Sequence, residues 1–236
     1  MKPRLLKIQS RTDFVEEVYN SLADAICEGS LAPGTRLTQE DIAEQLAVSR
    51  SPVLQALRLL KKDGLVQDAP GRGVLVAPLD PQWLGDLYEI RGSLDCLSAK
   101  LAAMRKAKLD AELFERGRDA FVSGDVRAMI DADMEFHFAI YAASGNRLIA
   151  ETARVHWVHL RRVMGALLQV SGQRESIWDE HAAIAKAIER GDVSLAVSLS
   201  EMHARRARQH FANEFNVLLG AQSGIEPKLL AEEMPA

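Results

Sequence analysis

Residues 82–220 have the spacing of amphipathic helices throughout. Apolar residues recur at three- and four-residue steps in six segments, residues 83–105, 110–123, 126–143, 148–170, 174–190 and 193–219. Most of the breaks between them, such as Gly124-Asp125 and Gly191-Asp192, place a conformationally permissive glycine beside a capping residue. This half contains no alternating strand pattern of any length, so a parallel nucleotide-binding sheet is not expected. The spacing predicts an antiparallel bundle of six helices.

The first 77 residues have a different pattern. Helical spacing predicts helices over residues 12–29, from Thr38 onward, and over residues 51–63. Two short strands are predicted after them, joined by a turn at Pro70-Gly71-Arg72. Pro78 and Pro81 then interrupt the pattern, because proline disfavours helix immediately before it.

These patterns predict a mainly α fold in four parts. The expected parts are a winged helix-turn-helix domain with a small β-hairpin over residues 1–77, a linker over 78–81, an all-helical domain over 82–220 and a flexible tail over 221–236.

Composition is that of an ordinary chain that folds in water. The chain has 236 residues, 47% of them hydrophobic, which is enough to bury a core without disulfides. Its longest apolar runs, such as residues 163–168, are far shorter than the roughly 18 residues that span a bilayer. Its basic N-terminus has no apolar secretion signal, and Cys27 and Cys96 have no metal-ligand spacing. We therefore expect free thiols, no membrane association and a cytoplasmic location.

Charge is distributed unevenly along the chain. The formal net charge of −4 argues against a uniformly basic surface, but residues 50–72 contain five basic and two acidic residues. DNA recognition requires only such a local basic face.

Two helices joined by a tight turn and followed by a hairpin are typical of proteins that place the second helix in a major groove. Here Ser49 and Ser51 can donate to phosphates, Arg50 can bind guanine or phosphate, and Arg72 can reach the DNA backbone or the minor groove. The alternative is a protein-interaction domain with a solvated basic face.

Four residues of the helical half suit a metal ion. Asp133 and His137 are four residues apart and share a helix face, and His181 and His203 lie in the middle of predicted helices near apolar positions. Three imidazoles and one carboxylate favour a divalent ion, zinc first, with nickel, manganese or iron as alternatives. The alternative is that the four residues lie apart, each satisfied by its own neighbours. Trp83, Trp157 and Trp178 are interpreted as core residues.

The N-terminal sequence closely resembles bacterial GntR-family transcription regulators. The resemblance rests on residues 23–37 (ADAICEGSLAPGTRL), residues 42–53 (IAEQLAVSRSPV), the pair Ala56-Leu57 and, after Leu60, the run Gly64-Leu65-Val66. It implies that Ser49, Arg50 and Ser51 contact DNA. The family commonly has Arg-Glu after the Pro-Val pair, whereas this chain has Leu54-Gln55, so Gln55 becomes a candidate DNA reader. Arg58 and Arg72 complete the expected DNA-binding set.

The helical half resembles the FCD effector domain of the FadR subfamily of GntR regulators. The resemblance rests on residues 133–137 (DMEFH), on Glu180-His181 and on Met202-His203. It implies that Asp133, His137, His181 and His203 hold a divalent ion beneath an effector cavity.

A further stretch of the same domain concerns the effector. Residues 87–91 (LYEIR) resemble its first helix, whose arginine commonly faces the cavity, so Arg91 is the expected effector-binding residue. Asp95 stands where glutamate is usual, and Cys96 is atypical. His156, His159 and His210 match no motif position. They are interpreted as surface residues or as residues that contact the metal ligands and not the ion.

The resemblance implies a ligand-responsive transcription regulator and not an enzyme. We expect a homodimer on two-fold symmetric operator DNA, repressing a metabolic operon until a small organic acid binds. A metal-dependent hydrolase is a weaker alternative, because the sequence has no His-Glu-x-x-His motif. A direct metal sensor, responding to the ion alone, is the remaining alternative.

Overall fold

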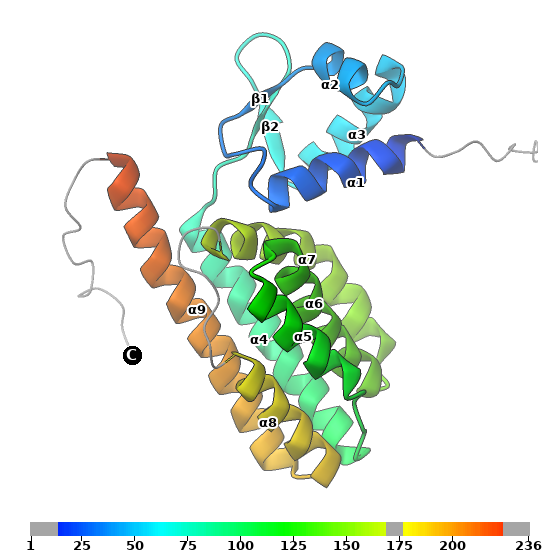
Figure 1. Cartoon of the computed structure of the whole chain (residues 1–236), viewed down its shortest axis with the longest axis vertical. Coiled ribbons are helices and arrows are strands. Elements are labelled where there is room, and N and C mark those ends of the chain that lie inside the picture. Colours follow the sequence, from blue (N-terminus) through cyan, green and yellow to red (C-terminus); the bar gives the residue numbers. More distant parts are fainter. Residues whose placement is uncertain (1–13, 169–176, 224–236) are drawn as a thin grey trace, which may run out of the picture. The chain divides into compact units, whose positions relative to one another are not determined.

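The computed structural model describes residues 14–168 and 177–223, with side chains as far as residue 214 (Figure 1). The chain divides into two compact units, here called the N-terminal unit and the helical unit; the main boundary lies between Pro78 and Leu79, and residues 27–29 are grouped with the second unit. The expected mainly α fold is confirmed. Of the expected tail, residues 224–236 lie outside the described residues, as do residues 1–13 and 169–176.

Three helices and a small sheet make up the N-terminal unit. They are α1 (Phe14–Cys27), β1 (Arg36–Leu37), α2 (Gln39–Gln45), α3 (Arg50–Lys62), β2 (Val66–Asp68) and β3 (Val74–Val76). The expected hairpin of β2 and β3 is present, and β1 adds a third strand in the antiparallel order β1-β3-β2. The side chain of Thr38 caps α2 by accepting a hydrogen bond from the backbone N–H of Asp41.

The turn of the hairpin packs closely against β1. Gly73 has a φ of 87°, and a Cβ at this position would lie 2.4 Å from the carbonyl oxygen of Leu37. Because only glycine fits this approach, residue 73 fixes where the hairpin meets the first strand.

All six expected helices of the helical unit are present. They are α4 (Pro81–Met104), α5 (Glu112–Ser123), α6 (Val126–Ala143), α7 (Arg147–Leu168), α8 (Ile177–Arg190) and α9 (Val193–Ser223). Pro81 is the first residue of α4 and not part of a linker, because proline suits a first helical turn and Asp80 caps it by accepting from the N–H groups of Gln82 and Trp83. Helix α9 continues past Gly220, since an isolated glycine does not by itself end a helix.

Two groups of buried apolar residues form the core of the helical unit. One surrounds Phe136 and Trp178 and draws on α4, α5, α6, α8 and α9, and the other surrounds Tyr141 and Trp157 on α6 and α7. The interpretation of Trp83 as a core residue is wrong, because 41% of its surface is exposed. Between the two groups lies a set of buried polar residues.

Candidate functional site

The exposed face of α3 carries polar and basic side chains in a row. Ser51, Gln55, Arg58 and Lys62 recur at positions i, i+4, i+7 and i+11, and all four are exposed. The opposite face buries Val53, Ala56, Leu57 and Leu60 in the core of the N-terminal unit. Lys62 was not among the expected DNA-binding residues, although the same helical spacing places it in the row.

The start of α3 presents donors to solvent. Ser49 is the N-cap residue, has extended backbone, and makes no side-chain capping hydrogen bond. The guanidinium of Arg50 lies 3.2 Å from a carboxylate oxygen of Glu40 on α2, and both side chains are largely exposed. Exposed ion pairs contribute little, so a phosphate can replace Glu40 as the partner of Arg50.

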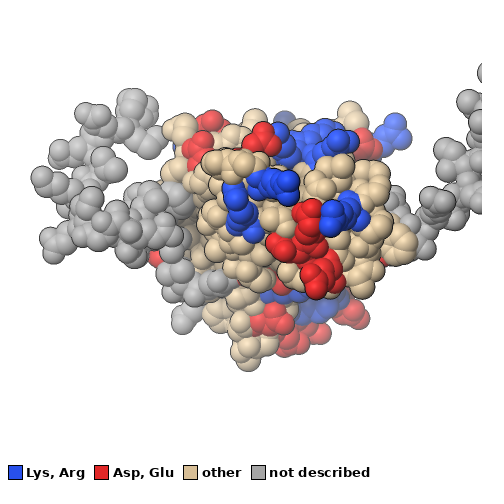
Figure 2. Space-filling view, turned by 90° about the horizontal axis from the view of Figure 1, so that it is seen from above, with Lys and Arg blue, Asp and Glu red and all other residues tan. Residues whose placement is uncertain are grey.

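One of the basic residues expected to contact DNA lies in the hairpin turn. Arg72 lies exposed in the turn, Lys61 pairs with Asp68 at 2.6 Å, and Arg36 donates to the carbonyl oxygen of Pro70. Figure 2 shows Lys and Arg in separate groups with Asp and Glu between them, which agrees with local rather than uniform positive charge.

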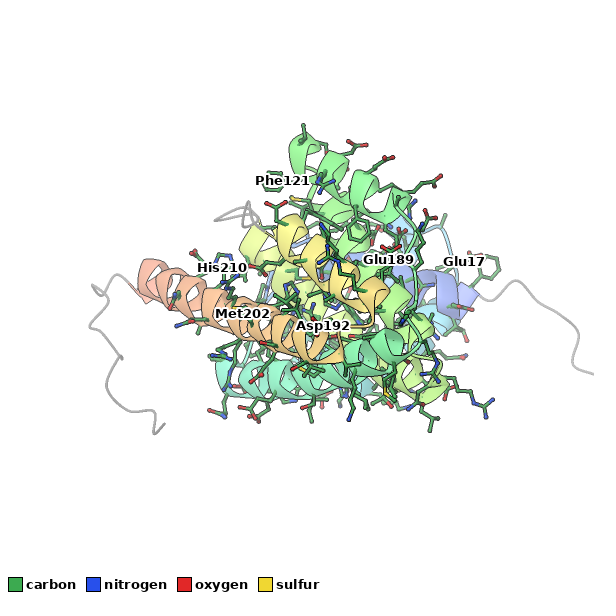
Figure 3. All side chains as sticks on the ribbon, turned by 90° about the horizontal axis from the view of Figure 1, so that it is seen from below. Glu17, Phe121, Glu189, Asp192, Met202 and His210 are labelled. Carbon is green, nitrogen blue, oxygen red and sulfur yellow. The ribbon has the colours of Figure 1, made fainter. Side chains whose placement is uncertain are left out.

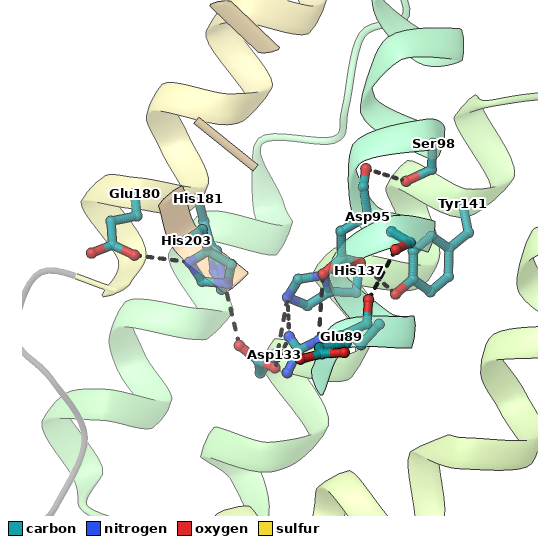
Figure 4. A network of polar contacts seen from close by, with 11 residues as sticks. Glu89, Asp95, Ser98, Asp133, His137, Tyr141, Glu180, His181 and His203 are labelled. Carbon is teal, nitrogen blue, oxygen red and sulfur yellow. Dashed lines mark hydrogen bonds and ion pairs between the residues drawn. The ribbon is translucent and has the colours of Figure 1, made fainter. Parts of the chain in front are cut away.

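In the helical unit, Asp133, His137, His181 and His203 lie together, all buried (Figure 4). Helix α6 supplies the first two, α8 the third and α9 the fourth. One nitrogen from each of the three histidines lies within 4.8 Å of the others. Asp133 Oδ1 is 3.5 Å from Nε2 of His181, and its Oδ2 is 3.9 Å from Nε2 of His137. We call these four residues the histidine cluster.

Two carboxylates orient rings of the histidine cluster. Asp95 Oδ1 lies 3.3 Å from Nδ1 of His137, and Glu180 Oε2 lies 2.8 Å from Nδ1 of His203. Tyr141 donates to the same oxygen of Asp95 at 2.6 Å. A carboxylate on Nδ1 leaves Nε2 as the ligand atom, the usual arrangement of metal-binding histidines. Glu180 belongs to the motif Glu180-His181 but was not expected to contact His203, and Tyr141 belongs to no motif.

Arg91 lies inside the same network. Its Nη2 is 2.6 Å from Nε2 of His137 and 3.5 Å from Oδ2 of Asp133, and its Nε is 3.4 Å from Oδ2 of Asp95. The guanidinium carbon also lies 5.1 Å from the ring centre of Trp157. A positive group therefore contacts both His137 and Asp133, the two cluster residues that α6 contributes.

Burial and charge set the protonation states of this network. Burial lowers the pKa of His203, although Glu180 acts in the opposite direction, so this ring favours the neutral form that binds metals. Burial also opposes charge on Arg91, but Asp95 and Asp133 outweigh it and raise its pKa. The network thus joins one guanidinium to two carboxyl groups, Asp95 and Asp133.

A pocket adjoins the cluster. It encloses about 520 Å³ of space not filled by protein atoms, part of it open to solvent, and Arg91, Asp133 and His203 reach its wall. The remaining wall is mostly apolar and consists of Tyr88, Met164, Leu167, Leu168, Ile177, Ala207 and His210. His210 was not expected here, although it follows His203 by seven residues on the same helix.

Two family models match the chain. The model for bacterial regulatory proteins of the gntR family matches residues 14–76, and the model for the FCD domain matches residues 86–206. The chain therefore belongs to the GntR family of bacterial transcription regulators and carries an FCD domain. It is a DNA-binding regulator of transcription and not an enzyme.

Individual relatives agree with this membership. An uncharacterized HTH-type transcriptional regulator of Streptomyces ambofaciens is 30% identical over 194 residues, covering 80% of this chain and 81% of the relative. A relative from Escherichia coli (strain K12), named as a regulatory protein of the L-lactate dehydrogenase operon, is 28% identical over 225 residues, covering 82% of this chain and 86% of the relative.

The fold is also shared with a solved GntR regulator from Rhodococcus sp. RHA1. It is 26% identical and superposes with a TM-score of 0.73 over 86% of this chain and 99% of that one. Among the described helices, none is long and apolar enough to span a membrane.

Proposed function

We propose that this protein is a ligand-responsive regulator that binds two-fold symmetric operator DNA as a homodimer. In this proposal the helical unit binds a divalent metal ion and a small organic acid, and the acid alters operator binding. The convergence of three buried histidines, Asp133 and Arg91 beside an apolar pocket carries the proposal.

The proposed DNA contacts are on α3 and the hairpin. Ser49, Arg50 and Ser51 at the start of α3 bind phosphates or base edges, while Gln55 and Arg58 project from its exposed face. Arg72 reaches the DNA backbone or minor groove from the hairpin turn. The exposure of all six side chains supports these roles.

Asp133, His137, His181 and His203 are the proposed metal ligands. Neutral imidazoles with one carboxylate suit zinc first, and nickel, manganese or iron next. When bound, the ion supplies a positive centre that holds an oxygen of an acid effector. The carboxylates on Nδ1 of His137 and His203 support this role, because they direct Nε2 of each ring toward the cluster. Since Nε2 of His137 contacts Nη2 of Arg91 at 2.6 Å, metal binding by His137 requires the Arg91 guanidinium to move.

Arg91 is the proposed clamp for the effector carboxylate. Its guanidinium can make two parallel hydrogen bonds to a carboxylate, and it already reaches the pocket wall. The apolar remainder of the wall suits a short carbon chain. The name of the E. coli relative, which refers to an L-lactate dehydrogenase operon, supports a small hydroxy acid as the ligand class.

Regulation requires that the acid bind the DNA-competent and DNA-incompetent arrangements with different affinity. We propose repression of a metabolic operon, relieved by the acid, in the cytoplasm where operator DNA is present. A direct metal sensor would instead respond to the ion alone.

Metal content and operator response test the proposal together. Purified wild type and His181→Ala are loaded with zinc, dialysed and analysed for bound metal, with His156→Ala as the control because His156 lies outside the histidine cluster. We expect about one ion per chain in wild type and in the control, and a loss of at least tenfold in His181→Ala. Equal metal content in all three proteins would contradict the metal site.

L-lactate and other short carboxylates are then titrated against operator binding at fixed zinc. We expect release of DNA by the effective acid in wild type and loss of that response in Arg91→Gln. A response to zinc alone, with no acid effective, would favour the metal sensor.

A further inference from the structure

The pocket beside the histidine cluster extends well beyond the residues that would hold an acid group. His203, Ala207 and His210 all line it and occupy positions i, i+4 and i+7 of α9, so they share one face of that helix. At about 1.5 Å per residue, the pocket follows this face for roughly 10 Å. Figure 3 shows His210 nearer than Met202 to the C-terminal end of α9. The pocket therefore has one end at Arg91 and His203 and another at His210.

The wall between these two ends is apolar. Helix α7 contributes Met164, Leu167 and Leu168, and Ile177 at the start of α8 continues the surface. None of these four side chains carries a group that donates a hydrogen bond to an oxygen. A ligand therefore gains stability by placing carbon here and loses it by placing a polar group. The middle of the pocket selects a hydrocarbon body, and L-lactate has only one methyl group to offer it.

His210 supplies a polar group at the far end of this wall. The residue is half-buried, and among the described residues no hydrogen bond or ion pair joins its ring to another group. The other histidine of the wall differs, because Nδ1 of His203 is held by Glu180 at 2.8 Å. An imidazole always has at least one N–H to donate. An oxygen at the far end of a ligand would satisfy this donor.

We propose that the effector is an acid with an apolar body about as long as the chain of octanoate and with a second oxygen at its far end. Its carboxylate lies at Arg91, its body lies along Ala207 and the wall of α7, and its second oxygen accepts a hydrogen bond from His210. This inference rests on the proposed function, because it takes the acid site at Arg91 from it and adds the chemistry of the rest of the ligand.

Chain length tests the apolar body. The dissociation constants of L-lactate, butyrate, hexanoate and octanoate are measured by calorimetry on zinc-loaded full-length protein. From butyrate to octanoate, each added methylene group should lower the constant about fourfold, the effect expected for one buried methylene. L-lactate that binds as tightly as octanoate would overturn this inference and leave an acid-responsive regulator standing. If neither these acids nor suberate bind, the acid site of the proposed function is rejected together with this inference.

Suberate tests the far end of the pocket. It has the carbon chain of octanoate with a carboxylate in place of the terminal methyl group. Wild type should bind suberate about tenfold more tightly than octanoate, because hydrogen bonds to charged groups are among the stronger ones. His210→Leu should reverse this order, since the second carboxylate would then lie against an apolar side chain. His210→Gln keeps a donor and should keep the wild-type order. The same order in His210→Leu as in wild type would overturn the role of His210.

A larger side chain at residue 207 tests where the body lies. Ala207→Leu should raise the dissociation constants of octanoate and suberate by roughly tenfold, because the added carbons occupy the middle of the pocket. Ala212→Leu is the matched control, since Ala212 lies on the same helix, is exposed and does not line the pocket. Equal constants in the two variants would overturn the placement of the body along α9.

Discussion

At the scale of single residues, the histidine cluster combines groups that are costly to bury separately. Asp95 is close to Arg91, His137 and Tyr141, and its pKa is lowered because His137 and Arg91 outweigh the effect of burial. Replacement of the usual glutamate by Asp95 thus keeps a carboxylate on His137. Because a buried polar group that loses its partner is costly, substitutions that remove a partner within this network should have large effects.

The lowered pKa of His203 predicts a pH dependence of stability. Below pH 6.5 the unfolded chain takes up a proton on His203 that the folded chain resists, so the free energy of unfolding falls as the pH drops from 6.5 toward the folded pKa. The slope from this group is at most about 1.4 kcal/mol per pH unit. Urea unfolding of metal-free protein between pH 5 and pH 8 measures it.

His203→Gln should flatten this part of the profile, and His156→Gln should not. A His203→Gln profile with the wild-type slope would show that His203 does not resist protonation in the folded chain.

At the scale of elements, close packing of α5 against α8 depends on one glycine. A Cβ at Gly117 would lie 2.0 Å from the indole of Trp178, which is buried. We expect Gly117→Ala to lower the free energy of unfolding by about 1–3 kcal/mol through overpacking, as measured by chemical denaturation.

Gly85 on α4 is the matched control, because a Cβ there would meet only the end of the Arg208 side chain at 3.7 Å. Gly85→Ala should be neutral or stabilising by up to about 1 kcal/mol, as expected for a helix interior. Equal destabilisation by both changes would mean that the Trp178 contact is not the cause.

The exposed face of α3 leads to a prediction about operator binding. Arg58→Ala should weaken operator binding. The logarithm of the association constant falls linearly with the logarithm of the salt concentration, and loss of one phosphate contact should make that fall less steep by about 1. Lys61→Ala is the control, since Lys61 lies beside this row and pairs with Asp68. Filter binding at several salt concentrations measures both. A slope change confined to Lys61→Ala would place the DNA on another face of α3.

Much of the element order could be predicted because apolar spacing and capping residues act locally. The six helices of the helical unit follow from spacing, and Thr38 caps α2 as its sequence suggests. Features that depend on tertiary contacts could not be predicted. The extended stretch of residues 36–37 is expected from the sequence, but its pairing with β3 is not. The exposure of Trp83, which lies on an uncovered face of α4, is a second such feature.

The candidate site was predictable only in part, because many of its contacts are tertiary and leave no local pattern in the sequence. The motif positions indicated Asp133, His137, His181, His203 and Arg91, and the structure brings all five together. The contact of Arg91 with His137 and the roles of Tyr141 and Glu180 require the packing of α4, α6, α8 and α9, which leaves no short-range pattern in the sequence.

At the scale of the whole molecule, the proposed function joins a DNA-reading unit to a sensing unit in one chain. Linkage then requires reciprocity: if the acid lowers operator affinity by some factor, operator DNA must lower affinity for the acid by the same factor. Calorimetric titration of the acid with and without saturating operator should give two dissociation constants whose ratio equals this factor. Unequal ratios in the two directions would mean that DNA and acid do not share one coupled equilibrium.

Selection of bound fragments from source genomic DNA, using zinc-loaded full-length protein and followed by footprinting at moderate salt, tests the central claim most directly. Moderate salt suppresses nonspecific phosphate binding, so a protected fragment reports sequence recognition. The account predicts a protected near-palindrome that overlaps a promoter, with protection lost in Arg50→Ala. Folded protein that protects no site, with or without metal, would contradict operator recognition by α3 and the hairpin.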